Sequence, residues 1–233
     1  LMGIQGNISL INLDIDPEGD LAKKTANIES IIASASKLTG QLLGFARGGK
    51  YQMNRVDIND LIESTSETFA MTQRNMRVHR NLTADLPPIE ADRNQMEQVL
   101  WNLYVNAADS MPNGGDVFIE TSIASHADLN GKTYEVKKGR YALLRVTDKG
   151  SGMDSEILER VFEPFFTTKE VGKGTGLGLA SVYGIVKSHN GYIEVESSVG
   201  KGTTFYIFLP FCKSELQLRQ TDVASPEAVS SRN

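Results

Sequence analysis

The sequence predicts an α+β fold, in which a two-layer α/β sandwich follows an antiparallel helical hairpin. Its 233 residues exceed the usual size of one domain, which indicates a full domain plus a smaller element. Within the predicted hairpin of residues 1–47, residues 4–13 read as the last turns of an amphipathic helix, and residues 21–45 carry apolar side chains in two near-heptad rows, as packed helices do. From residue 54 onward, helical patterns and short antiparallel strands segregate instead of alternating as strand–helix–strand units.

The hairpin is predicted from two amphipathic helices, one ending near Leu13 and one running from about Leu21 to Ala46. A lone hairpin would expose its apolar stripe to water, so the stripe either packs on the next domain or forms a four-helix homodimer. We favour the homodimer. Gly48 and Gly49 interrupt the helical pattern, so residues 48–53 are expected to form a linker.

The larger domain is expected to span residues 54–212, and residues 213–233 read as a polar tail or linker. We expect its strands near residues 51–58, 76–84, 116–122, 141–147, 192–196 and 203–209, and its helices at 59–73, 93–111 and 176–190. A glycine-rich irregular stretch precedes Thr175.

Composition excludes several classes of protein. The net charge of −5 argues against nucleic acid as a partner, because phosphate backbones are bound by clustered Lys and Arg. Cys212 is the only cysteine, so one chain can build neither a disulfide nor a thiolate zinc site. No apolar run reaches the roughly 20 residues that span a bilayer. We therefore expect a cytoplasmic fragment without direct membrane insertion, whose parent protein can still be anchored upstream.

The helix predicted at residues 93–111 has a polar face. Gln98, Asn102, Asn106 and Asp109 recur at three- and four-residue spacing, so they project from the same side. A solvated helix surface gives the same pattern. Carboxamide oxygens are also hard ligands that Mg²⁺ accepts together with phosphate oxygens and water.

Two glycine-rich segments follow predicted strands or precede a helix. Asp148, with Gly150 and Gly152, ends an apolar strand, where a carboxylate can accept a hydrogen bond from an exocyclic amine, although a plain Asp/Gly turn looks alike. The second segment leads into a helix, and its backbone N–H groups suit an anion such as phosphate. It comprises Gly172, Lys173, Gly174, Thr175, Gly176, Leu177, Gly178 and Leu179.

Between these segments, an aromatic cluster at Phe162, Phe165 and Phe166 stands in a polar stretch. Such a cluster either packs under a surface loop or anchors a mobile lid over a ligand. A Walker A loop is excluded, because Gly131-Lys132-Thr133 has His126 where that motif needs a glycine. A Rossmann fingerprint is excluded as well, because no Gly-x-Gly-x-x-Gly occurs.

The ordered motifs resemble the N, G1, F, G2 and G3 boxes of sensor histidine kinases of the NtrB-like or hybrid group. They comprise Asn102 to Asn106, Asp148 to Gly152, Phe162 to Phe166, Gly174 to Leu179 and Gly200 to Phe205. The resemblance implies the Bergerat-type ATP-binding fold of the GHKL proteins and a histidine kinase core of a two-component system. Such a core transfers the γ-phosphoryl of Mg-ATP to a histidine on the dimerisation helix, from which it passes to an aspartate of a response regulator receiver domain.

The resemblance also implies residue roles. Asn106 is expected to hold Mg²⁺ with Asn102 nearby, as the catalytic pair, and Asp148 to bind the adenine amine with support from Thr203. Lys169 and Lys173 are expected to neutralise the phosphates. The full expected ATP-binding set is Asn102, Asn106, Asp109, Asp148, Gly150, Gly152, Met153, Phe162, Phe166, Thr168, Lys169, Gly172, Lys173, Gly174, Thr175, Gly176, Leu177, Gly178, Leu179 and Thr203.

Two alternatives remain within this fold, a GHKL-type ATPase and a degenerate ATP-binding scaffold. Gyrase-like relatives carry a glutamate, the base that activates water, where this chain has Asn102, which favours the kinase. The family's acceptor histidine lies in the first hairpin helix, whereas the histidines here are His79, His126 and His189. We expect none of them to be the acceptor, and we expect the acceptor to lie shortly before Leu1.

Overall fold

The computed structural model describes residues 52–129, 136–169 and 174–212, together with isolated positions between residues 7 and 28. Most of the predicted hairpin, residues 48–51 of the predicted linker and the predicted tail 213–233 lie outside the described residues. Within the described part, no helix is long and apolar enough to cross a membrane.

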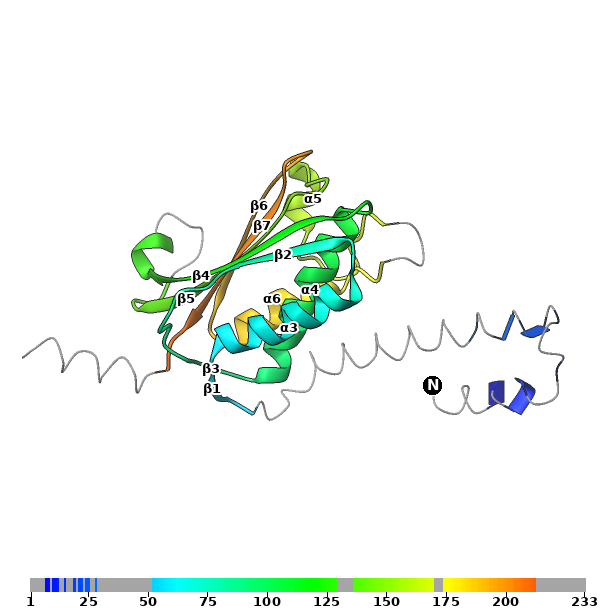
Figure 1. The fold of residues 1–233 in the computed structure, drawn as a ribbon, viewed down its shortest axis with the longest axis horizontal. Coiled ribbons are helices and arrows are strands. Elements are labelled where there is room, and N and C mark those ends of the chain that lie inside the picture. The colour runs from blue at the N-terminus through cyan, green and yellow to red at the C-terminus, as the bar shows by residue number, and fades with distance from the viewer. Residues whose placement is uncertain are drawn as a thin grey trace, which may run out of the picture.

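A five-stranded sheet forms one layer of the domain (Figure 1), with strand order β2-β4-β5-β7-β6. Its strands are β2 (Met76–Asn81), β4 (Gly115–Ser125), β5 (Arg140–Asp148), β6 (Tyr192–Ser198) and β7 (Gly202–Pro210). All neighbours pair antiparallel except β2 and β4, which run parallel. The expectation of purely antiparallel pairing was therefore wrong for this pair, because the chain crosses over through a helix between the two strands.

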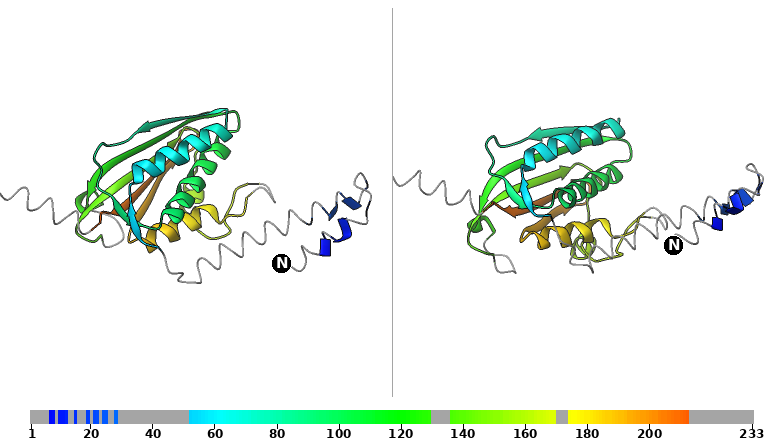
Figure 2. Two further views of the ribbon diagram at one scale, coloured as in Figure 1. Left: turned by 60° about the horizontal axis from the view of Figure 1, so that its bottom comes forward. Right: turned by 90° about the horizontal axis from the view of Figure 1, so that it is seen from below.

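Three helices form the second layer and cover one face of the sheet (Figures 1 and 2). They are α3 (Ile58–Thr72), α4 (Arg93–Ser110) and α6 (Gly178–Ser188). Asp57 and Asp92 cap the first two, since each side chain accepts hydrogen bonds from backbone N–H groups of the first turn. The predicted two-layer sandwich is confirmed.

The core lies between the two layers. Apolar side chains from every third or fourth helical residue meet alternate residues of the strands, and most are less than a tenth exposed. Representative members are Leu61, Phe69, Leu100, Leu103, Tyr104, Ile119, Leu144, Val182 and Ile207. Tyr104 is so deeply placed that burial raises its pKa to about 12.

Several short elements were not expected from the sequence. They are β3 (Ile89–Ala91), which pairs with β1 (Asn54–Val56), the 3₁₀ helix η1 (His126–Leu129) and the helix α5 (Ser155–Arg160). Each is too short to show a hydrophobic period. α5 lies within the stretch that we expected to be irregular, so that expectation was wrong for residues 155–160.

The buried ring of His189 joins α6 to α4. Its Nε2 accepts a hydrogen bond from the backbone N–H of Asp92 (3.0 Å), and its Nδ1 donates to the Ile185 carbonyl oxygen (2.8 Å). Asp92 also caps α4 and accepts a bond from the backbone N–H of Gln52 (3.2 Å). This contact fixes the spacing of the two helices that border the site.

Candidate functional site

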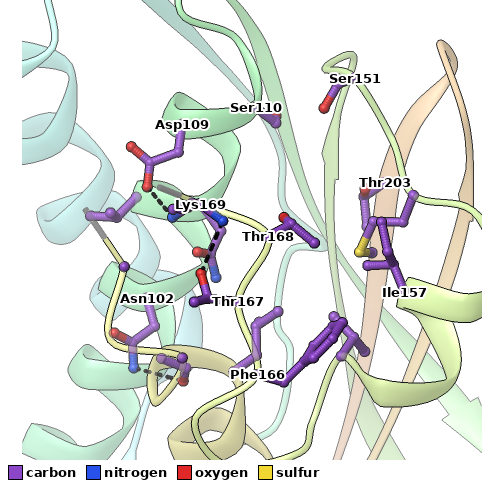
Figure 3. A pocket seen from close by; sticks show the side chains of 18 of the residues that line it. Asn102, Asp109, Ser110, Ser151, Ile157, Phe166, Thr167, Thr168, Lys169 and Thr203 are labelled. Carbon is purple, nitrogen blue, oxygen red and sulfur yellow. Dashed lines mark hydrogen bonds and ion pairs between the residues drawn. The ribbon is translucent and has the colours of Figure 1, made fainter. Parts of the chain in front are cut away.

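A cavity of about 420 Å³ opens between α4, the ends of β5 and β7, and the loop that joins α5 to α6. Figure 3 shows side chains from all of these elements facing one space. The cavity is lined by Asn102, Val105, Asn106, Asp109, Ser110, Asp148, Ser151, Gly152, Met153, Ile157, Val161, Phe166, Thr167, Thr168, Lys169, Gly174, Thr175, Gly176, Gly178, Leu179, Thr203 and Phe205.

Most residues expected from the sequence lie in this lining. Three of them do not, namely Gly150, Phe162 and Leu177. The backbone N–H of Gly150 donates a hydrogen bond to Asp148, while the side chains of Phe162 and Leu177 pack into the protein. Gly172 and Lys173 lie outside the described residues. The remaining expected residues surround one cavity, which was the arrangement that the motifs required.

The polar face of α4 forms one wall. Asn102 donates a hydrogen bond from Nδ2 to the Gly178 carbonyl oxygen (3.2 Å), which ties the wall to the first turn of α6 (Figure 3). One turn later, Asn106 has a buried Nδ2 with no hydrogen-bond partner among the described residues. Buried amide donors rarely lack a partner, so Asn106 is positioned for a group supplied by a ligand.

Asp148 ends β5 at the other side of the cavity and is 6% exposed. Its Oδ1 accepts hydrogen bonds from Ser110 Oγ (3.1 Å) and the Gly150 backbone N–H (2.8 Å). Burial raises the pKa of this carboxyl, while these bonds and one from the backbone of Thr203 lower it, and burial outweighs them. A carboxylate held in this way is a directional acceptor for an amine.

Within the glycine segment, Gly176 lies where only glycine fits. Gly176 has a φ of +65°, and a Cβ there would lie 2.3 Å from the carbonyl carbon of Phe165. The Phe165 backbone N–H donates to the Gly176 carbonyl oxygen (2.9 Å). The loop before α6 therefore folds directly onto the aromatic segment, and any side chain at Gly176 would separate the two.

The side chains of the aromatic segment divide between the core and the cavity. Phe162 packs against Tyr183 of α6, with ring centroids 5.4 Å apart, so it anchors the loop to the core. Phe166 lines the cavity, and the Arg160 guanidinium lies 4.3 Å from its ring centre. Further along, Lys169 forms an ion pair with Asp109 of α4, so this cation closes the loop against the helix wall (Figure 3).

Sequence motifs missed several lining residues: Val105, Ser110, Ser151, Ile157, Val161, Thr167 and Phe205. Val105 and Ser110 lie beside the amides on α4, and helical periodicity of three and four residues would have included them. Ile157 and Val161 belong to α5 and its end, for which the sequence showed no period.

The matching family is "Histidine kinase-, DNA gyrase B-, and HSP90-like ATPase", over residues 91–213. This match covers more than half of the chain, and the chain belongs to that family. The chain is similar to sensor histidine kinases. It is 41% identical over 203 residues to the sensor kinase CckA of Brucella abortus (strain 2308), covering 86% of this chain and 22% of CckA.

Solved structures agree on the fold. The catalytic domain of the histidine kinase ThkA is 27% identical, with a TM-score of 0.55, and the match covers 69% of this chain and 96% of that domain. Full-length ShkA in complex with AMPPNP is 23% identical, with a TM-score of 0.65, over 85% of this chain and 40% of ShkA. The chain thus spans about a fifth of CckA and two fifths of ShkA.

Proposed function

We propose that this chain is the catalytic core of a protein-histidine kinase, which binds Mg-ATP in the cavity and transfers the γ-phosphoryl group to a histidine. One observation carries the proposal: Asn106, Asp148 and Gly176, from three separate motifs, line the same cavity. An amide wall, a buried carboxylate and open glycine backbone are complementary to a triphosphate with its metal, to an amine-bearing base and to phosphate oxygens.

In the proposed complex, the adenine amine donates to Asp148, with Thr203 beside it. Gly174, Gly176 and Gly178 line the cavity without side chains, which leaves room for phosphates beside the backbone. Lys169 lines the same cavity and would serve them by exchanging its contact with Asp109 for a phosphate oxygen.

The residues present fit Mg²⁺. No cluster of three or more His, Cys, Asp or Glu side chains that could cage a metal occurs among the described residues. Mg²⁺ is commonly held by a few protein oxygens together with phosphate oxygens and water. Asn106 offers an amide oxygen to such an ion, and its unpartnered Nδ2 can donate to a phosphate oxygen. When bound, Mg²⁺ would neutralise charge that develops on the phosphates.

The cavity favours transfer to a presented nucleophile over hydrolysis. The carboxylates in its lining are Asp109, which is paired with Lys169, and Asp148, which is engaged by Ser110 and Gly150. Asp148 is therefore not free to activate water, and Asn102 stands where gyrase-like relatives carry the glutamate that does so. In the transfer, the bond from the γ-phosphorus to the β–γ bridging oxygen breaks, a bond to an imidazole nitrogen forms, ADP leaves and the imidazole proton passes to solvent.

The acceptor histidine is proposed to come from the dimerisation helix. His79 lies in β2, with Nε2 2.7 Å from Asp116 Oδ1, and His126 opens η1. His189 is buried between α4 and α6. None of the three lines the cavity. We therefore propose a homodimer through the helical hairpin, with the phosphoryl group passing onward to a response regulator receiver domain.

Binding is tested first, with a fluorescent ATP analogue titrated in Mg²⁺ and again in excess EDTA. We expect micromolar binding that weakens without the metal. A chain that does not bind the analogue would instead match a degenerate scaffold.

Transfer is tested with a longer protein that carries a histidine in the first hairpin helix. From γ-³²P-ATP we expect label that is stable in base and lost in acid, together with slow ATP hydrolysis. Fast hydrolysis without labelled protein would favour the ATPase alternative and refute the kinase proposal.

A further inference from the structure

Ser110 is the last residue of α4, and its hydroxyl lies between two acceptors. Its Oγ is 2.8 Å from the Ala107 carbonyl oxygen and 3.1 Å from Asp148 Oδ1. The hydroxyl has one proton and donates to one of them at a time. An ionised carboxylate is the stronger acceptor, so the proton turns toward Asp148 when that group is charged.

The contact between α4 and the end of β5 is built closely around this serine. A Cβ on Gly150 would lie 2.0 Å from Ser110 Oγ, and the Ser151 backbone N–H donates to the Ser110 carbonyl oxygen (3.2 Å). Ser110 therefore meets the turn after Asp148 through both its side chain and its backbone. Figure 3 places Ser110 beside Asp109 at the cavity, with Thr203 across the space.

The contact with Ser110 limits how many hydrogen bonds Asp148 can still accept from a ligand. A carboxylate offers about four acceptor positions. Three of these acceptor positions on Asp148 are taken by the Ser110 hydroxyl, the Gly150 N–H and the backbone of Thr203. About one remains for a ligand, and because the others are fixed by backbone or by a helix end, that position has one direction.

We propose that Ser110 is a positioning residue that orients the Asp148 carboxylate and keeps it ionised, and so sets the preference of the cavity for a purine with an exocyclic 6-amine. The proposal rests on the proposed function, because it assumes that a nucleotide base reaches Asp148. Other charged side chains in the cavity lining, Asp109 and Lys169, are paired with each other. Outside the lining, the ammonium of Lys149 lies 4.8 Å from the Phe118 ring centre.

The test compares ADP with IDP, which has a 6-oxo group in place of the amine, using calorimetry on the wild type and on Ser110→Ala. Ser64→Ala is the matched control, because Ser64 Oγ makes the same bond to a carbonyl one turn earlier in α3 (3.1 Å to Leu61 O) and does not line the cavity. Each protein is titrated at several pH values from acidic to neutral.

We expect Ser110→Ala to bind ADP about tenfold more weakly, as for loss of one hydrogen bond to a charged group, with IDP affinity unchanged. Without the serine, the Asp148 pKa should rise, so the pH at which ADP affinity is half lost should move upward by about one unit. Equal weakening for ADP and IDP, or an unmoved midpoint, would overturn the inference. Wild-type protein that binds ADP no better than IDP would overturn adenine recognition by Asp148 itself.

Discussion

Replacing Asp148 by asparagine tests a buried polar contact of the cavity. The substitution keeps the shape of the side chain and an Oδ1 that can still accept from Ser110 and Gly150. The second carboxylate oxygen becomes an NH₂ group, which meets the ligand amine donor to donor. Loss of one charge-assisted hydrogen bond weakens adenine nucleotide binding by roughly 10- to 150-fold, and the opposed donors add to this loss.

The free energy of unfolding should not fall with Asp148→Asn, in contrast to the affinity for nucleotide. Because burial raises the pKa of Asp148, its contribution to folding is fully present below its unfolded pKa and is lost as the pH rises through its folded pKa. Asparagine carries no charge, so Asp148→Asn should be at least as stable as the wild type at neutral pH. The advantage should shrink in acid.

The assay for Asp148→Asn is calorimetric titration with ADP, paired with urea unfolding. Asp128→Asn is the control, because Asp128 likewise accepts from a backbone N–H and a serine hydroxyl, both of Ser125, but does not line the cavity. Binding within threefold of the wild type would refute the role of Asp148 in nucleotide recognition. An unfolded variant would show that the carboxylate is needed for the fold instead.

Three further substitutions probe other parts of the site. Gly176→Ala should lose ligand binding and clearly lower the melting temperature, because Gly176 has a φ of +65° and its Cβ would lie 2.3 Å from backbone. The control Gly200→Ala, with a φ of +75° and open space around it, should lower the free energy of unfolding by only about 1–2 kcal/mol. Asp109→Asn should release Lys169 and tighten ADP binding by up to about fivefold in calorimetry, so weaker binding would argue against a phosphate role for that lysine. His189→Leu should destabilise the domain to urea by about 1–3 kcal/mol, because a backbone N–H at the start of α4 loses its acceptor; an unchanged midpoint would show that the ring is dispensable.

Much of the fold and site could be predicted, since each motif has a local physical cause. The amide row of α4 follows from helical period, and Asp148 was found because it ends an apolar strand beside glycines. Gly176 was expected to need open backbone, and its positive φ agrees. The residues that make up each signal lie within a few positions of one another, which is the range over which sequence patterns are informative.

The remaining features depend on partners distant in sequence. Nothing near Lys169 indicates that it meets Asp109. Leu177 sits among phosphate-type glycines yet packs into the core at 5% exposure. The parallel pairing of β2 with β4 follows from where α4 packs. A local sequence pattern does not predict such contacts between distant residues.

The walls of the cavity come from separate segments around Asn102, Asp148, Gly176 and Thr203, which together span about a hundred residues of sequence. They meet only when the sheet has closed against α4 and α6. No single helix or hairpin of the chain can therefore retain part of the affinity. A bound nucleotide should accordingly stabilise the whole domain against unfolding by RT ln(1 + [L]/Kd). Melting temperature would then report occupancy, and saturating ligand should protect slowly exchanging amides on both layers at once.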